Sequence, residues 1–253
     1  MTPAERLIVA LDVDTVEAGT RLVRALVPAG VTHFKVGLGF FTAAGPSAID
    51  MVQAQGGKVF LDLKFHDIPS TVARAVRAAS RLGVWMTNLH IQGGSAMMRE
   101  ATRAVREEAR RSNRKPPLLI GVTVLTSMAE RDLVDLGLRK TLKDQVLYLS
   151  KLARSVGLDG IVASAQEAQI IRWACGQDFV IVTPGIRPGQ TRDPFSNPSS
   201  RPGPGAGDDQ QRTATPLEAL KSGSDYLVVG RPILEAPDPA QMAKEILLAL
   251  QGA

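Results

Sequence analysis

The segment Leu61-Asp62-Leu63-Lys64-Phe65-His66-Asp67-Ile68-Pro69 holds two carboxylates and one ammonium close together. Side chains two positions apart on a strand point to the same face, so Asp62 and Lys64 project together, and Asp67 follows in the turn. Charged groups on an interior face are costly unless they pair with one another or serve a function. An ammonium held between carboxylates can stabilise developing negative charge and donate a proton. A purely structural layer of ion pairs explains the spacing of Asp62 and Lys64 equally well.

Neighbouring strands are expected to add two more charges. Lys35 lies in Phe34-Lys35-Val36-Gly37, and Asp12 follows the first apolar run of the chain. In a parallel barrel the carboxyl ends of the strands meet at one opening, where active sites are built. A second cation at that opening favours a functional site over a structural ion-pair layer.

Two arginines follow the last two predicted strands. Arg187 lies in the segment TPGIRP and Arg231 in the segment VVGRP. The loops after strands seven and eight of such barrels recurrently hold phosphate, and a guanidinium offers a planar fork for phosphate oxygens. Gly185 and Gly230 let the backbone approach a ligand closely. Arginines that are simply exposed at the surface are the alternative explanation.

The elements that must position these residues alternate along the chain. Short β-branched apolar runs are separated by helical patterns of about ten or more residues, which is typical of βα units and a parallel sheet. On one such helix Val146, Leu149, Ala153 and Val156 share a face. The pattern predicts a single (β/α)8 TIM barrel domain over residues 1–253. A doubly wound open sheet would instead carry an early glycine-rich phosphate loop. The predicted strands are Leu7–Val13, His33–Gly37, Val59–Phe65, Trp85–His90, Leu118–Leu125, Gly160–Ser164, Val180–Thr183 and Tyr226–Val229.

Composition and charge limit the other classes of function. The 253 residues carry 30 Lys and Arg against 25 Asp and Glu, a net charge of +5, which favours anionic ligands without marking a nucleic-acid binder. No run approaches the roughly 18 apolar residues of a membrane span. Cys175 is the single cysteine, so we expect a cytoplasmic protein without disulfides and without nucleic-acid or membrane partners. Cys175, Trp85 and Trp173 are expected to pack in the core or against helices.

One long loop interrupts the alternation of strands and helices. Residues 188–209 are rich in Pro, Gly, Ser and Asp, and Phe195 is their one large apolar residue. Connections of this length are uncommon in compact domains and are usually functional lids or inserted segments. The sequence leaves both alternatives open.

The segment DLKFHDIP, residues 62–69, resembles the signature of the orotidine 5′-phosphate decarboxylases. Further segments resemble that family in register over nearly the whole chain: LD at 11–12, KVG at 35–37, VLTS at 124–127, and the PGIR and VGRP segments. The resemblance implies a (β/α)8 barrel that converts orotidine 5′-phosphate to uridine 5′-phosphate without a cofactor, the last step of UMP synthesis.

The resemblance also implies roles for single residues. Lys64 is implied as the proton donor to C6 of the pyrimidine, with Asp62 and Asp67 beside the departing carboxylate and Lys35 completing the charged network. In the family, Asp67 and Thr71 reach into the neighbouring subunit's site, which implies a homodimer. The implied substrate-binding residues are Asp12, Lys35, Thr71, Thr126, Arg187, Gln210, Gly230 and Arg231.

The chain departs from the family between Arg187 and Gln210, where its sequence is longer than usual, so Gln211 is the alternative to Gln210. Two other functions stay open. One is a metal-dependent decarboxylase or aldolase that acts on 3-keto sugar phosphates, and the other is a catalytically inactive nucleotide-binding barrel. The three histidines have no metal-ligand spacing, and no metal site is expected.

Overall fold

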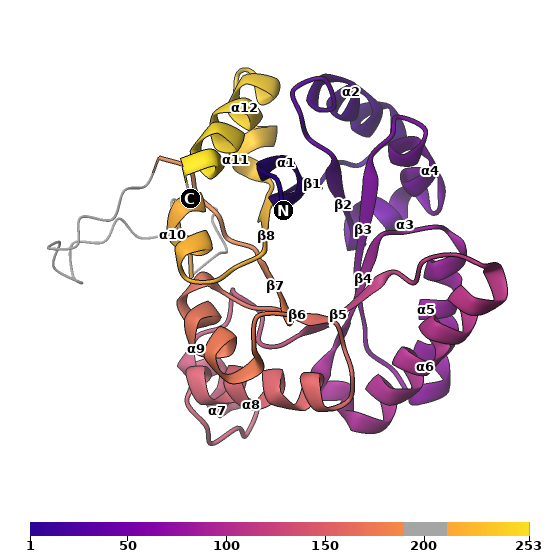
Figure 1. Ribbon diagram of the computed structural model, residues 1–253, viewed down its shortest axis with the longest axis vertical. Coiled ribbons are helices and arrows are strands. Elements are labelled where there is room, and N and C mark those ends of the chain that lie inside the picture. The colour runs from indigo at the N-terminus through magenta and orange to yellow at the C-terminus, as the bar shows by residue number, and fades with distance from the viewer. Residues whose placement is uncertain (190–211, 253) are drawn as a thin grey trace, which may run out of the picture.

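Eight parallel strands close into a barrel in the computed structural model, which describes residues 1–189 and 212–252 (Figure 1). Each strand pairs with its neighbours in the sequence, and β1 pairs with β8, so the sheet closes on itself. The predicted (β/α)8 TIM barrel is confirmed. The strands are β1 (Leu7–Leu11), β2 (His33–Gly37), β3 (Lys58–Phe65), β4 (Met86–His90), β5 (Leu118–Val122), β6 (Gly160–Val162), β7 (Val180–Thr183) and β8 (Tyr226–Val229).

Helices surround the ring of strands (Figure 1). Four of the longer helices begin at a residue whose side-chain oxygen accepts a hydrogen bond from a backbone N–H of the first turn. These capping residues are Thr15, Thr141, Ser164 and Asp238. No helix within the described ranges is long and apolar enough to cross a membrane. The helices are α1 (Pro3–Arg6), α2 (Val16–Leu26), α3 (Leu38–Ala44), α4 (Ser47–Gln53), α5 (Pro69–Arg81), η1 (Ile91–Gly93), α6 (Gly94–Ser112), α7 (Glu130–Asp135), α8 (Leu142–Ser155), α9 (Ala165–Cys175), α10 (Pro216–Lys221), α11 (Arg231–Leu234), α12 (Pro239–Ala249) and η3 (Leu250–Gly252).

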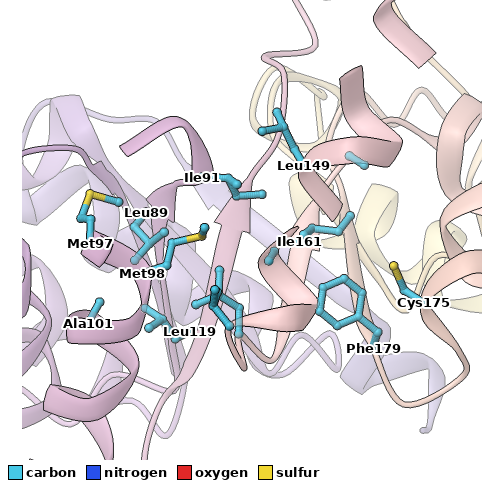
Figure 2. Packing of buried hydrophobic residues seen from close by; sticks show 14 of the residues in the cluster. Leu89, Ile91, Met97, Met98, Ala101, Leu119, Leu149, Ile161, Cys175 and Phe179 are labelled. Carbon is cyan, nitrogen blue, oxygen red and sulfur yellow. The ribbon is translucent and has the colours of Figure 1, made fainter. Parts of the chain in front are cut away.

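Apolar side chains fill two layers, one between strands and helices and one inside the barrel. Figure 2 shows part of the outer layer, in which Leu119 of β5 and Ile161 of β6 lie among side chains from α6, α8 and α9. The predicted face of α8 is buried as expected. The inner layer consists of Ile8, Ala10, Phe60, Met86, Ile120, Val182 and Val228.

The two tryptophans and the cysteine differ in their surroundings. Cys175 is buried, as predicted, and Trp85 is half-buried. The prediction for Trp173 is wrong, because its side chain is 86% exposed. Ile171 and Cys175 lie one turn apart on the buried face of α9, and the helical period turns Trp173 away from that face.

Strand ends differ from the predicted bounds by up to three residues. Beyond β5, the Thr123 hydroxyl donates to Val162 O at 2.8 Å, and beyond β6 the Ser164 side chain caps α9. Polar side chains therefore replace regular strand pairing where the chain turns into the loops. β1 ends at Leu11 instead of Val13, β5 at Val122 instead of Leu125 and β6 at Val162 instead of Ser164, whereas β3 begins at Lys58 instead of Val59 and β4 at Met86 instead of Trp85.

The predicted loop over residues 188–209 lies largely outside the described residues. Pro188 and Gly189 form a turn after β7, and the described chain resumes at Arg212. The choice between a lid and an inserted segment stays a prediction.

Aromatic rings pack at the amino end of the barrel. The His33 ring lies 4.3 Å from that of Trp85, and Trp85 lies 5.1 Å from Tyr226, measured between centroids. His33 is 2% exposed, and its Nδ1 is 2.8 Å from the Thr32 hydroxyl oxygen. Burial, with a smaller contribution from Lys58, lowers the pKa of His33 to about 4.

Because the folded pKa of His33 is depressed, its neutral form stabilises the fold above pH 6.5, and this contribution is lost as pH falls toward 4. We expect His33→Gln to reduce the loss of unfolding free energy between pH 7 and pH 4 by up to about 3 kcal/mol. Urea denaturation of wild type and variant at pH 7 and pH 4 measures this change in unfolding free energy. His66→Gln, which changes an exposed histidine, is the control, and equal pH dependence in wild type and His33→Gln would contradict the prediction.

Candidate active site

The carboxyl ends of the strands surround a cavity of about 260 Å³. Most of the charged residues predicted for the site meet here. Asp67 and Thr71 do not line the cavity of their own chain, and Asp67 is exposed in the turn after β3. Gln210 and Gln211 lie outside the described residues. The predicted residues that line the cavity are Asp12, Lys35, Asp62, Lys64, Thr126, Arg187, Gly230 and Arg231.

Asp62 lies between two ammonium groups. Its Oδ1 is 2.8 Å from Lys64 Nζ and its Oδ2 is 3.4 Å from Lys35 Nζ. Lys35 Nζ also lies 3.3 Å from Asp12 Oδ1. Three adjacent strands therefore contribute one alternating chain of charges, with Asp12 after β1, Lys35 on β2, and Asp62 and Lys64 on β3.

Gly37 leaves the space that the Lys35 ammonium occupies. A Cβ at position 37 would lie 2.8 Å from Lys35 Nζ and 3.4 Å from Asp12 Oδ1. The strand register brings Gly37 opposite Asp62. A side chain at the end of β2 would therefore push the Lys35 ammonium from its place between the carboxylates of Asp12 and Asp62.

The two buried charges at the centre of this network hold one another ionised. Burial alone opposes ionisation of Asp62, but Lys35 and Lys64 outweigh it and hold its pKa below the ordinary value. Burial likewise opposes the charge on Lys35, and Asp62 and Asp12 outweigh it, so the pKa of Lys35 is raised. Asp62 and Lys35 are therefore both charged throughout the neutral pH range.

Arg187 and Arg231 line the cavity from the segments after the last two strands. They follow β7 and β8, and β7 stands opposite β3 in the closed ring of eight strands. Backbone hydrogen bonds hold the Arg187 segment, because Arg187 N donates to Ala214 O at 2.9 Å and Ala214 N donates to Gly185 O at 3.2 Å. A Cβ at Gly230 would lie 3.3 Å from Asp12 Oδ2.

Two buried polar groups beside the cavity were missed in the sequence. Asn88 on β4 is fully buried and bonds to both Asp62 and Lys64. Strand alternation puts Asn88 on the interior face with Met86, and a buried amide needs partners, so this position was a usable signal. Arg212 had none, because its partners are remote in sequence.

Arg212 joins three segments next to the cavity. Its Nη1 donates to Glu167 Oε1 on α9 at 2.9 Å, and its Nη2 donates to the carbonyls of Val124 and Leu125 at 3.4 and 3.0 Å. These carbonyls immediately precede Thr126, which lines the cavity. Both side chains of the ion pair are less than one-tenth exposed. Burial outweighs the attraction of Arg212, so the pKa of Glu167 is raised despite its partner.

Comparison with known proteins shows the family. A family model described as "Orotidine 5'-phosphate decarboxylase / HUMPS family" matches residues 5–246. This chain belongs to that family. Among proteins named orotidine 5′-phosphate decarboxylase, the one from Moorella thermoacetica is 51% identical, covering 99% of this chain and 94% of the relative. The one from Syntrophotalea carbinolica is 47% identical, covering 98% of this chain and 96% of the relative.

One solved structure supports the same family, and a second shares the fold. A crystal structure of orotidine 5′-phosphate decarboxylase from Lactobacillus acidophilus matches with a TM-score of 0.79 and 36% sequence identity. The match covers 96% of this chain and 97% of that chain. A protein from Geobacillus kaustophilus matches with a TM-score of 0.77 and 34% identity, over 95% of this chain and 97% of that one.

Because the Arg212–Glu167 pair is buried, we expect replacement of Arg212 to cause a pH-dependent loss of stability. Arg212→Met leaves Glu167 buried without its cation, and we expect a loss of about 3–5 kcal/mol of unfolding free energy at pH 7. Since the folded pKa of Glu167 is raised, the part of this loss that comes from the unpaired carboxylate is absent at low pH and grows as pH rises through that pKa. Denaturant unfolding at pH 4 and pH 7 measures both.

A matched control is Arg154→Met, which breaks the exposed Arg154–Asp178 pair and should cost much less, because solvent screens an exposed ion pair. The double variant Arg212→Met/Glu167→Leu should regain most of the loss, because no buried charge is then unpaired. Equal losses for the Arg212 and Arg154 variants would contradict the importance of the buried pair.

Proposed function

We propose that this protein catalyses the decarboxylation of orotidine 5′-phosphate to uridine 5′-phosphate. The observation that carries the proposal is the Lys64 ammonium, 2.8 Å from a buried carboxylate, on the wall of a cavity whose opposite wall holds Arg187 and Arg231. The relatives' names support this substrate.

The arrangement suits a ligand with a phosphate at one end and a reacting carbon at the other. Arg187, Gly230 and Arg231 would hold the phosphate, because guanidinium groups bind phosphate oxygens in pairs of hydrogen bonds. Thr126, after β5, would contact the base, and Asp12 and Lys35 would hold the ribose. Gln210, with Gln211 as the alternative, is assigned the contact between the base and the phosphate from the resemblance alone, since both lie outside the described residues. Binding energy from the phosphate would then serve orientation at the reacting carbon.

Lys64 is proposed as the proton donor. The bond between C6 and the carboxylate carbon breaks, carbon dioxide leaves, and the electron pair stays on C6 of the pyrimidine. The Lys64 ammonium stabilises that negative charge and transfers a proton to C6, forming the C6–H bond, and neutral Lys64 then takes a proton from water. Asp62 holds the ammonium in place. Every charge that this step uses comes from the chain and the substrate, so the proposal includes no cofactor.

The charged network weighs against the two alternative functions. A divalent cation at Asp12 or Asp62 would have to displace the Lys35 ammonium, which pairs with both carboxylates. An inactive nucleotide-binding barrel has no use for Asp62 and Lys64, since a buried ion pair is often no more stable than apolar side chains of similar size.

We further propose a cytoplasmic homodimer in which Asp67 and Thr71 complete the partner's site. Asp67 is exposed and does not line its own cavity. Ile68, next to Asp67 in the chain, and Leu38, directly after the neighbouring strand β2, are each 64% exposed. Exposed apolar side chains at the opening of the barrel suit a surface that another protein chain covers. A second copy packed on this surface would cover it and bring Asp67 to Lys64 of its partner.

The proposed reaction is tested by following the loss of orotidine 5′-phosphate absorbance with purified protein and EDTA. We expect turnover that EDTA does not change. Lys64→Ala should lower kcat by a factor on the order of 10³ or more, because both charge stabilisation and proton donation are lost. Absence of turnover in the wild type would refute the proposal, and turnover abolished by EDTA would favour the metal-dependent alternative.

The shared site is tested by mixing inactive variants. Lys64→Ala and Asp67→Ala homodimers should each be nearly inactive, whereas a mixed dimer has one site with both residues intact. Random exchange makes half of the dimers mixed, so activity should approach roughly a quarter of the wild-type value. The matched control mixes Lys64→Ala with Asp62→Ala, whose defects lie in the same barrel, and should not recover. If exchange occurs and the first mixture stays inactive, Asp67 acts within its own chain.

A further inference from the structure

The backbone of Lys64 adopts a conformation that side chains disfavour. Its φ is 50°, in the left-handed region, which costs a non-glycine residue on the order of 1 kcal/mol. Asn113 shares this conformation but ends a helix, where it is common. Lys64 lies within strand β3, where the pairing with β4 changes register between Leu61 and Phe65. A neighbouring group must therefore hold Lys64 in this conformation.

Asn88 is that group. It lies on β4 and is fully buried. Its Oδ1 accepts the Lys64 backbone N–H at 2.8 Å, and its Nδ2 donates to Asp62 Oδ1 at 2.6 Å. The side-chain amide therefore supplies a partner for the strand N–H at the irregularity in the sheet.

The same amide also orients the central carboxylate. Asp62 Oδ1 receives Asn88 Nδ2 and Lys64 Nζ, which leaves Oδ2 facing Lys35 Nζ at 3.4 Å. Rotation of the carboxylate would break the bond to Asn88 and change the distances to both ammonium groups. Asn88 therefore controls the position of Lys64 in two ways. It bonds to the backbone N–H of Lys64, and it orients Asp62, the carboxylate that pairs with the Lys64 ammonium.

We propose that Asn88 is a positioning residue that holds the Lys64 ammonium at the reacting carbon. This inference rests on the proposed function. It differs from a general structural role because Asn88 bonds to Lys64 and Asp62, whereas Arg187 and Arg231 belong to the segments after β7 and β8. Loss of Asn88 should therefore reduce the rate of the chemical step and leave phosphate-directed binding intact.

Thr87 offers a matched control. It is the preceding residue on β4, is equally buried, and donates its hydroxyl to Leu61 O on β3 at 3.0 Å. Alternation along the strand turns it to the other face. Thr87→Val removes one buried hydrogen bond between the same two strands without touching the charged network.

The first experiment compares Asn88→Ala and Thr87→Val. We expect Asn88→Ala to lower kcat by about 10²-fold, while KM and the dissociation constant of uridine 5′-phosphate change by no more than about threefold. Thr87→Val should keep kcat within about twofold of wild type. Equal effects of both variants on kcat, or a loss confined to KM, would overturn the inference.

The second experiment uses Asn88→Asp and pH. A protonated Asp at position 88 can still accept from Lys64 N and donate to Asp62, whereas its carboxylate repels Asp62. The titratable groups facing position 88 are Asp62 and Lys64 of β3, with Lys35 behind Asp62 and His90 along β4, while Ile120 of β5 is apolar. We expect kcat of Asn88→Asp, relative to wild type, to fall as pH rises, with an apparent pKa that belongs to the pair of carboxyl groups.

A kcat ratio independent of pH would contradict that expectation.

The third measurement does not depend on activity. A crystal structure of Asn88→Ala should show Lys64 displaced from its left-handed backbone conformation and the Lys64 Nζ moved away from Asp62 Oδ1. Lys64 unchanged in that structure would overturn the inference, whatever the rates. Absence of turnover in the wild type would refute the proposed function instead, and the crystal structure would still decide the role of Asn88.

Discussion

The carboxylate of Asp62, buried between the ammonium groups of Lys35 and Lys64, is the interaction on which the rest of the site depends. A charge in this interior is tolerable because opposite charges lie within 2.8 and 3.4 Å of it. Those distances need a rigid framework, and parallel strands in fixed register supply it. The barrel brings β2 and β3 together, and glycine at position 37 leaves room for the Lys35 ammonium.

In the closed ring, the residues proposed for the chemical step and those proposed for phosphate binding come from different strands. Strands β1 to β3 carry the alternating charges, and the segments after β7 and β8 carry the arginines. Arg212 connects the segment before α10 to the loop after β5 through its bonds to Glu167, Val124 and Leu125. A buried ion pair that contributes little net stability can still fix the relative position of two loops.

Local patterns predicted the barrel and most of the charged residues that line its cavity, because period-two alternation and charges at strand ends need only neighbouring residues. The pairing of Asp62 with Lys64 follows from their spacing, and Lys35 lies on the neighbouring strand β2. Strand alternation places Asn88 on the interior face, but its bond to the Lys64 backbone depends on a register change between β3 and β4 that the sequence does not reveal. The strand β5 was predicted to extend to residue 125 because residues 123–125 are as β-branched and apolar as a strand. In the structure these residues form the loop that follows β5. Trp173 was misjudged because residue type was given more weight than helical period.

The interior of the barrel below the charged layer is filled by Phe60, Met86 and Ile120, and the rings of His33, Trp85 and Tyr226 pack beyond them. Within the described part of the chain, the cavity therefore opens at one end. Under the proposed chemistry, the gas released beside Lys64 has to escape through the same opening by which the nucleotide entered. Until the carbon dioxide escapes, it can add back to the carbanion, so net turnover depends on the relative rates of protonation and recombination. An ammonium already in place when the bond breaks raises the rate of protonation relative to recombination.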